Sequence, residues 1–466
     1  MKKMKGIFPG LILLLNVLPL PAIQFSVENG DNTYDLTIGG YGGLSCGQII
    51  SGYGSFNQVI NHAWLQNAYL GLLFDAVTND RFRVILNGEV HLTFSYFAPS
   101  NYIGKYIWND FFAEAYTFFL REARGVYLLG DLEFEKLYLQ THVGKFPYSY
   151  NAEACNLGEY LFRGTAYPTY MLNGFDDSTS YPLMGILLSS NCGLKPVKLD
   201  LILTSETQKY PLQDWSLAGI ASIGIGPFGD NIGKFLEIGG GLCLDRVFSK
   251  DKDFTTPADP DNLYEFEITQ DTMYDSTGNV VWNIDDPNDI HPEWVYDTSG
   301  KYYTFKSTKA MLRWQIDPKA FFNVDIFGPE DLKLYGEIGF LGFKNYGDYY
   351  DDIRERMPFM FGFNFPAFKI LDVLSCEIEI FKNPYVAGFE ECFNNGVVKP
   401  VDRGFTTTNF YWSIYAKKRL GAFTIVTQFA RDHIHPVNNN LSYTERSDVL
   451  VESDDWWWAG KIHFGF

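Results

Sequence analysis

The sequence is poor in basic residues and has no long apolar run beyond its N-terminus. It contains 37 Lys and Arg against 56 Asp and Glu, which gives a formal net charge of −19. A chain this short of positive charge is a poor binder of nucleic acid and of anionic membrane surfaces. After residue 22, no stretch approaches the ~18 apolar residues that a membrane-spanning helix needs. These two shortages argue against a nucleic-acid partner and against a helical membrane protein.

Cysteine and catalytic motifs are also scarce. The chain has 6 Cys among 466 residues, too few for a disulfide scaffold, and no pair has CxxC spacing. None of the histidines lies in a motif that identifies a nucleophile. We therefore expect no enzymatic activity, no cofactor and no metal site. Cys243 and Cys376 fall in predicted strands, where packed, reduced thiols are the expectation.

The N-terminus has the pattern of a secretory signal peptide. A basic start is followed by an apolar core and a small-residue cleavage site: Lys2, Lys3 and Lys5; Ile7 to Leu18; Leu20-Pro21-Ala22. No Cys follows the cleavage site, which argues against a lipoprotein anchor. The pattern predicts a signal peptide over residues 1–22 and a single domain over residues 23–466.

Aromatic residues and glycine are abundant. Aromatics make up 17% of the chain, with 30 Tyr, 40 Phe and 43 Gly, which suits many strands joined by tight turns. The clearest strand is Arg81–Tyr96, where one face carries Phe82 and Val84 and the other carries Arg83 and Glu89. A soluble sheet with one wet face gives the same alternation, so a single strand does not decide between the two classes.

About sixteen segments of this kind follow one another, with a range of about 14 to 18 because some of them alternate poorly. They are Tyr34–Leu44, Trp64–Asp75, Arg81–Tyr96, Glu114–Glu122, Glu133–Gly144, Tyr181–Ser190, Val197–Glu206, Ser216–Gly226, Leu236–Phe248, Tyr303–Ile316, Leu332–Phe343, Phe359–Phe365, Leu371–Phe381, Thr408–Lys417, Phe423–Ala430 and Trp456–Phe466.

The connections between these segments alternate between short and long. Short ones are Ala76–Asp80, Asn191–Pro196, Pro366–Ile370 and Lys418–Ala422; long ones are Cys46–Ala63, Lys145–Ser180, Ser249–Tyr302, Lys382–Thr407 and Arg431–Asp455. A membrane barrel has short periplasmic turns and long outer loops, whereas a soluble sandwich has no reason to place its long loops on one rim. We therefore predict an all-β fold, a closed antiparallel transmembrane β-barrel with both termini on the periplasmic side.

The last segment, Trp456–Phe466, alternates aromatic and polar residues and ends on Phe. It resembles the C-terminal strand of bacterial outer-membrane barrels, which the barrel insertion machinery recognises. Together with the signal peptide, the strand number and the loop rhythm, it makes the chain resemble a sixteen-stranded outer-membrane porin. The resemblance implies the outer membrane, contacts with lipid and lipopolysaccharide, a homotrimer as one assembly, and small hydrophilic solutes, saccharides or ions among them, as cargo.

In porins of this size the third outer loop folds into the lumen, and here that loop is Lys145–Ser180. We expect a short helix over Asn151–Phe162 with Asn151 as its N-cap. Carboxylates facing basic wall residues create a transverse field that filters solutes by charge and size. The expected constriction and pore lining are Lys145, Glu153, Glu159 and Arg163 with Arg83, Glu89, Lys136, Lys309, Arg313 and Lys461.

Two alternatives remain at this point. The first is a barrel without a channel, acting as an adhesin or receptor through its long outer loops, and the second is a secreted soluble β-protein. The acidic loop Ser249–Tyr302 could bind Ca²⁺ or bridge lipopolysaccharide through divalent cations, although it lacks EF-hand spacing. Much of the net charge lies in this loop, so the composition does not settle the ion selectivity of a lumen.

Overall fold

The computed structural model describes residues 22–29, 32–51, 62, 64–79, 81–93, 116–129, 138–162, 181–191, 197–205, 215–226, 235–248, 264–265, 295–296, 308–321, 325–343, 352–382, 385–386, 401–402, 410–431 and 456–465. Within these ranges, no helix is long and apolar enough to cross a membrane. Two short 3-10 helices are present there, η2 (Pro318–Phe321) and η3 (Ile353–Arg356).

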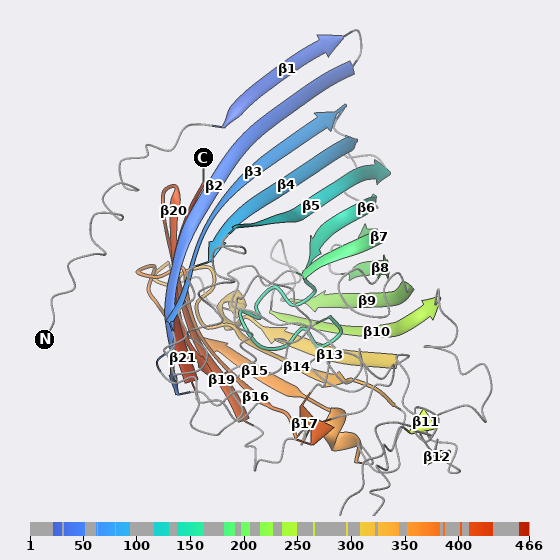
Figure 1. Cartoon of the computed structure of the whole chain (residues 1–466), viewed down its shortest axis with the longest axis vertical. Helices are drawn as coiled ribbons and strands as arrows, with labels where there is room; N and C mark the ends of the chain where they lie inside the picture. Colours follow the sequence, from blue (N-terminus) through green and yellow to red (C-terminus); the bar gives the residue numbers. More distant parts are fainter. Residues whose placement is uncertain are drawn as a thin grey trace, which may run out of the picture.

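Sixteen antiparallel strands form a closed ring (Figure 1). Each strand pairs with the next along the chain, and β21 pairs with β2 to close the barrel, with Gly465 opposite Tyr41. The strands are β2 (Asn32–Ser51), β3 (Trp64–Thr78), β4 (Phe82–Thr93), β5 (Tyr116–Leu129), β6 (Tyr138–Tyr148), β7 (Tyr181–Asn191), β8 (Val197–Ser205), β9 (Trp215–Ile225), β10 (Leu236–Phe248), β13 (Thr308–Ile316), β14 (Leu334–Phe340), β15 (Phe359–Asn364), β16 (Val373–Ile380), β19 (Phe410–Leu420), β20 (Phe423–Arg431) and β21 (Trp456–Gly465). Each predicted strand has its counterpart, so the predicted fold class is confirmed.

The two rims of the ring differ in the length of their connections. On one rim, here called the short rim, the strands are joined by residues 79–81, 192–196, 365–372 and 421–422. On the opposite, long rim they are joined by segments that include 94–115, 149–180, 249–307, 381–409 and 432–455. Two connections depart from the rule, because 206–214 is brief for the long rim and 317–333 is extended for the short rim. The alternation predicted from the sequence therefore holds around most of the ring.

Several predicted boundaries are wrong. Strand β2 continues to Ser51, so Cys46 lies in a strand and not in the first long loop. Strand β6 continues to Tyr148, so Lys145 also lies in a strand and not at the start of the third loop. The glycine-rich part of β2 has few apolar side chains, and its period of two is therefore invisible. The register with β3 extends it, because Gln48 still pairs with Trp64.

Strand β1 (Ile23–Asn29) was not predicted. It pairs with β2 from Ile38 to Asn32, along the same edge of β2 that β21 occupies from Tyr41 onward (Figure 1). Strand β1 thus continues the ladder where β21 ends and covers backbone groups of β2 that would otherwise form an open edge. Two small two-stranded sheets are separate from the ring: β11 (Tyr264–Glu265) with β12 (Val295–Tyr296), and β17 (Tyr385–Val386) with β18 (Val401–Asp402).

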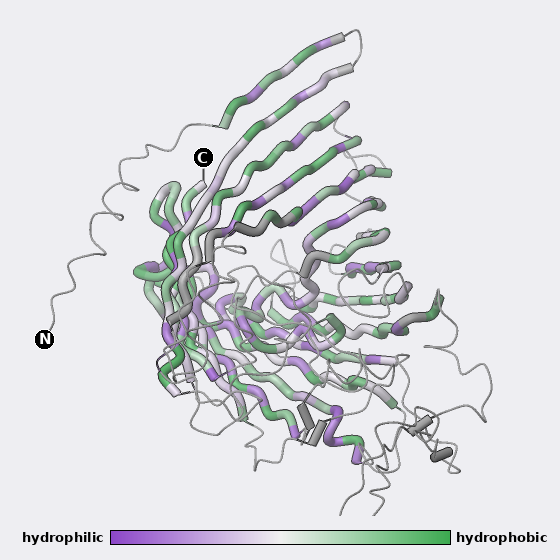
Figure 2. Tube along the Cα trace, in the orientation of Figure 1, coloured by the Kyte–Doolittle hydropathy of each residue, from purple (hydrophilic) through white to green (hydrophobic). Residues whose placement is uncertain are grey.

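The two faces of the barrel wall have opposite polarity. Figure 2 shows hydrophobic and hydrophilic residues alternating along strands such as β2 to β5. Large apolar side chains such as Leu70, Leu201 and Leu312 are exposed, whereas polar ones such as Glu377 and Arg313 are buried on the inner face. An apolar outside and a polar inside are the arrangement of a transmembrane β-barrel. Cys243 and Cys376 are free thiols in the wall, as predicted.

Candidate functional site: a segment anchored inside the barrel

Residues 149–162, the described part of the third long connection, lie inside the barrel (Figure 1). We call them the interior segment. Their apolar side chains join two buried clusters on different parts of the wall. Ala154, Leu157 and Tyr160 pack with Tyr335, Leu341, Met360, Phe381 and Tyr411, whereas Tyr150, Leu161 and Phe162 pack with Phe146, Tyr148, Leu187, Ile202, Ala218, Ile220, Cys243 and Met311. The segment therefore contacts wall strands from β6 to β10 and from β13 to β19.

The predicted helix over residues 151–162 is wrong, because the segment consists of turns and bends. Gly158 and Glu159 both have left-handed backbone conformations, with φ of +87° and +61°, which a right-handed helix cannot contain. Asn151 is not an N-cap, since its side-chain amide donates to the Glu337 carboxylate at 3.0 Å. Carboxylates of the wall take up the backbone N–H groups that a helix would have paired with its own carbonyls.

The first of these carboxylates is Glu377 on β16. It accepts hydrogen bonds from three consecutive backbone N–H groups, those of Cys155 at 2.6 Å, Asn156 at 2.9 Å and Leu157 at 2.9 Å. The Tyr335 hydroxyl donates to the same carboxylate at 2.8 Å. Glu377 is fully buried. A carboxylate oxygen makes stronger hydrogen bonds than a neutral acceptor does. This carboxylate fixes the central turn of the interior segment to the wall.

The second carboxylate is Glu337 on β14. It accepts hydrogen bonds from the backbone N–H groups of Glu159 and Tyr160, both at 2.8 Å, and from the Tyr150 hydroxyl at 2.6 Å. Gly158 permits this approach, because a Cβ there would lie 2.6 Å from Met360 Cε and 3.2 Å from Glu337 Oε2. Glu337 thus ties the two ends of the interior segment to one point of the wall.

Glu159 closes the segment on itself. Its Oε1 accepts hydrogen bonds from the backbone N–H groups of Tyr150 at 3.0 Å and Asn151 at 2.6 Å, and from the Ser149 hydroxyl at 2.6 Å. Glu159 was expected to carry charge into the lumen. In the structure it is fully buried, and its carboxylate holds backbone groups together.

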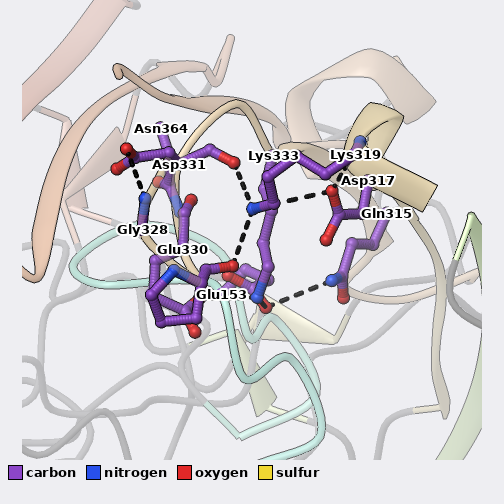
Figure 3. Close-up of polar contacts among 10 residues, drawn as sticks. Glu153, Gln315, Asp317, Lys319, Gly328, Glu330, Asp331, Lys333 and Asn364 are labelled. Atoms are coloured by element: carbon purple, nitrogen blue, oxygen red, sulfur yellow. Dashed lines mark hydrogen bonds and ion pairs between the residues drawn. The ribbon is translucent and has the colours of Figure 1, made fainter. Parts of the chain in front are cut away.

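Glu153 connects the interior segment to the short rim. Figure 3 shows its carboxylate receiving hydrogen bonds from Lys333 Nζ at 2.7 Å and from the Gln315 amide at 3.1 Å. Lys333 also pairs with Glu330 at 2.6 Å. Burial raises the pKa of Glu153, against the opposing effect of Lys333. Burial lowers the pKa of Lys333, but its two carboxylate partners outweigh burial, and the net shift is upward.

We expect Lys333→Met to loosen the interior segment in a pH-dependent way. The change leaves the Glu153 carboxylate buried without its cation, which costs roughly 3–5 kcal/mol when the group is charged. A carboxyl whose pKa is higher in the docked segment takes up a proton on docking, so docking strengthens as the pH falls through that raised pKa and weakens as it rises. Open-channel current noise should therefore exceed that of the wild type at pH 8, and the excess should shrink as the pH is lowered to 5.

The matched control is Lys369→Met, which removes an exposed lysine that pairs with Asp325 on the short rim. It should leave the noise unchanged at both pH values. Equal noise of the Lys333→Met variant at pH 8 and pH 5 would contradict the assigned role of Glu153.

The remaining predicted residues are distributed over the wall. Lys309 and Arg313 on β13 are buried, and they pair with Asp245 at 3.8 Å and with Glu237. Arg83 donates to Asp75 at 2.7 Å. Lys145 pairs in the ladder with Ala123 and with the exposed Met184. Arg163 and Lys136 lie outside the described residues.

Glu89 and Lys461 belong to an aromatic part of the inner wall formed by β2, β3, β4 and β21. Tyr69 stacks between His91 and His463, with ring centroids 5.5 and 6.1 Å away, and its hydroxyl lies 2.8 Å from His463 Nδ1. Lys461 Nζ lies 5.0 Å from the Tyr69 ring, at cation–π distance. Glu89 accepts hydrogen bonds from the Tyr41 hydroxyl at 2.7 Å and from Arg121. The structure therefore separates these two residues from the interior segment's anchors.

The principal anchors, Glu337 and Glu377, were absent from the expected site. Glu377 and Glu379 lie two residues apart on one face of β16, and Glu337 lies two residues after Tyr335 on one face of β14. A carboxylate among apolar neighbours on an inner face was the available signal. The sequence does not reveal which backbone groups it would meet. Within the described ranges, no group of three His, Cys, Asp or Glu side chains converges as metal ligands would. The acidic loop considered for Ca²⁺ lies outside those ranges, apart from two short strands.

No protein-family model matches the chain, and no curated protein matches it in sequence. Several solved structures align with it. A mutant of the Rh. blastica porin has 7% identity and a TM-score of 0.40, and the match covers 92% of this chain and 100% of that one. OmpF of Salmonella typhi, in complex with daunomycin, has 12% identity and a TM-score of 0.43, covering 95% and 100%. The outer membrane channel DcaP of Acinetobacter baumannii has 10% identity and a TM-score of 0.42, covering 93% and 97%. These are likenesses of overall fold alone, at sequence identities of 12% or less.

Proposed function

We propose that the protein is an outer-membrane porin through which small hydrophilic solutes diffuse without chemistry, in a lumen that the interior segment narrows. The observation that supports this proposal is the anchoring of residues 149–162 inside a closed barrel by Glu337 and Glu377. A segment held at this many points inside a wall has a defined position, and a defined position is what a size-selecting constriction requires.

The charges on the inner wall favour a hydrated lumen. Arg83 and Lys198, for example, each keep half of their side-chain surface exposed. Charged side chains in contact with lipid cost ~2–4 kcal/mol each near the midplane, so a barrel of this composition is stable when its interior contains water. Water in the interior is the first requirement of a diffusion channel.

The proposal includes an orientation and a set of partners. We place the short rim in the periplasm together with both termini, and the long loops outside, with residues 1–22 removed as a signal peptide. The partners are outer-membrane lipid, lipopolysaccharide, the insertion machinery through Trp456–Phe466, and a homotrimer of this chain. Saccharides and ions are the solutes that fit a polar, aromatic interior.

Reconstitution in a planar bilayer tests the proposal. We expect stepwise conductance from the wild type and a larger single-channel conductance after deletion of Asn151–Arg163, because the deletion removes the narrowing segment. Heat-modifiable migration in SDS confirms that the deletion variant still forms a barrel. An unchanged step size in a folded deletion variant would place the constriction elsewhere, and a silent wild-type barrel would favour an adhesin or receptor.

A further inference from the structure

We infer that the channel prefers small anions, because on strands β3 to β8 the cations of the inner-wall ion pairs face the lumen while their carboxylates lie behind them. The inference rests on the proposed channel function and names the class of solute that the channel favours. It runs against the net charge of the chain, which is −19. The sign of the lumen surface is decided by which partner of each pair remains accessible.

Four ion pairs on these strands share one order of exposure, with the cation more accessible than the carboxylate in each. The exposed fractions of the side chains are 50% against 18% for Arg83–Asp75, 36% against 8% for Arg121–Glu89, 18% against 12% for Arg124–Glu122 and 50% against 3% for Lys198–Asp200. A permeating ion on this side of the barrel therefore meets the positive end of each pair first.

Hydroxyl donors in the wall bind two of the four carboxylates, Asp200 and Glu89, on the side away from the lumen. Asp200 accepts hydrogen bonds from the Tyr148 hydroxyl at 2.7 Å and from the Ser189 hydroxyl at 2.6 Å, which leaves Lys198 as its partner toward water. Glu89 accepts from the Tyr41 hydroxyl at 2.7 Å and contacts His91 at 2.7 Å, while Arg121 covers it. The order of exposure is thus built into the packing of the wall.

Three further carboxylates of the interior are removed from the lumen surface by the interior segment. Glu159, Glu337 and Glu377 are fully buried, and they accept hydrogen bonds from backbone N–H groups and from the hydroxyls of Ser149, Tyr150 and Tyr335 respectively. A carboxylate surrounded by donors at hydrogen-bond distance presents little negative surface to a passing ion. Anchoring the segment therefore also shields three negative charges.

Two pairs, both between β10 and β13, have the opposite order. Asp245 is 13% exposed against 2% for Lys309, and Glu237 is 35% exposed against 7% for Arg313. Glu237 is the second residue of β10 and lies at the short rim, so it acts on ions at that mouth. It provides a matched variant of the opposite sign. Since the Debye length is about 10 Å at 0.1 M salt, the wall charges act across much of a lumen at that concentration or below.

The test is the reversal potential of single channels in a KCl gradient, because K⁺ and Cl⁻ have similar mobilities in water. We expect a chloride-to-potassium permeability ratio above one for the wild type. The double variant Arg121→Gln and Lys198→Gln should lower the ratio by about twofold per charge, because a unit charge about 8 Å away in water at 0.1 M salt favours Cl⁻ and disfavours K⁺ by about 1.5-fold each. Glu237→Gln should raise it. Arg354→Gln, which neutralises an exposed residue of η3, should leave it unchanged.

The outcomes separate the two proposals. The anion preference is overturned, and the channel function is not, by either of two results. The first is stepwise conductance of the wild type with a chloride-to-potassium permeability ratio below one, and the second is a ratio that the double variant does not lower. An absence of steps from a barrel shown to be folded by heat-modifiable migration overturns the channel and the preference together. Steps whose selectivity shifts in opposite directions in the Gln variants of the two signs support both.

Discussion

Replacing Glu377 by Leu is expected to release the interior segment from the barrel wall. The change leaves three consecutive backbone N–H groups and the Tyr335 hydroxyl without their acceptor. A buried donor without a partner costs about 1–3 kcal/mol, so the three N–H groups together lose roughly 3–9 kcal/mol of docking free energy. Glu377→Gln keeps one acceptor oxygen and should have an intermediate effect.

The thiol of Cys155 reports on this release, because its own backbone N–H is one of the three. Burial raises the pKa of Cys155, and an undocked segment would lower the pKa toward its usual value and expose the sulfur. In a chain whose other cysteines are replaced by Ser (Cys46, Cys192, Cys243, Cys376 and Cys392), maleimide should react with Cys155 much faster in the Glu377→Leu variant than with Glu377 intact. Single-channel conductance should rise in the same variant.

Ser413→Ala is the matched control, since it removes one acceptor of the segment, the partner of the Asn156 side chain at 2.6 Å. It should cost about 1 kcal/mol and leave the labelling rate of Cys155 close to that of the parent. Equal labelling in the Glu377→Leu and Ser413→Ala variants would show that Glu377 does not anchor the segment.

Placing arginine on the outer face is expected to destabilise the barrel in a membrane. Leu201 lies at the middle of β8 and is 47% exposed among other apolar side chains of that face. An arginine at the bilayer midplane costs about 2–4 kcal/mol in a transmembrane barrel. Leu201→Arg should therefore lower the urea concentration at the unfolding midpoint of the protein in lipid vesicles.

Ile353→Arg provides the control. The side chain of Ile353 is 41% exposed, a fraction similar to that of Leu201. Ile353 lies in η3 on the long rim, however, where water solvates the new charge. Its effect should stay within about 0.5 kcal/mol. If the two arginine variants unfold at the same urea concentration, the outer face is not in contact with lipid.

The sequence by itself determined the fold class of this protein. Alternation with a period of two is local, because successive side chains of a strand point to opposite faces, and it can be read without knowing the partner strand. Connection lengths are equally local, and their alternation predicted two unlike rims. The prediction of strands failed where a strand is defined by its partner and not by its own residues. The glycine-rich part of β2 has no visible alternation of apolar and polar residues. Strand β1 forms where β21 has ended opposite Tyr41, because residues 32–38 of β2 extend beyond that point and pair with it.

The tertiary structure decided how the interior is used. Cys155 and Glu377 are 222 residues apart in the chain, and the closed ring brings them together. The interior segment has the composition of a short helix, but the wall carboxylates compete for its N–H groups and two left-handed residues complete the turn. In the Lys198–Asp200 and Arg121–Glu89 pairs, hydroxyl donors from other strands likewise decide which partner is exposed. Contacts between distant residues are set by register and closure, which no local pattern contains.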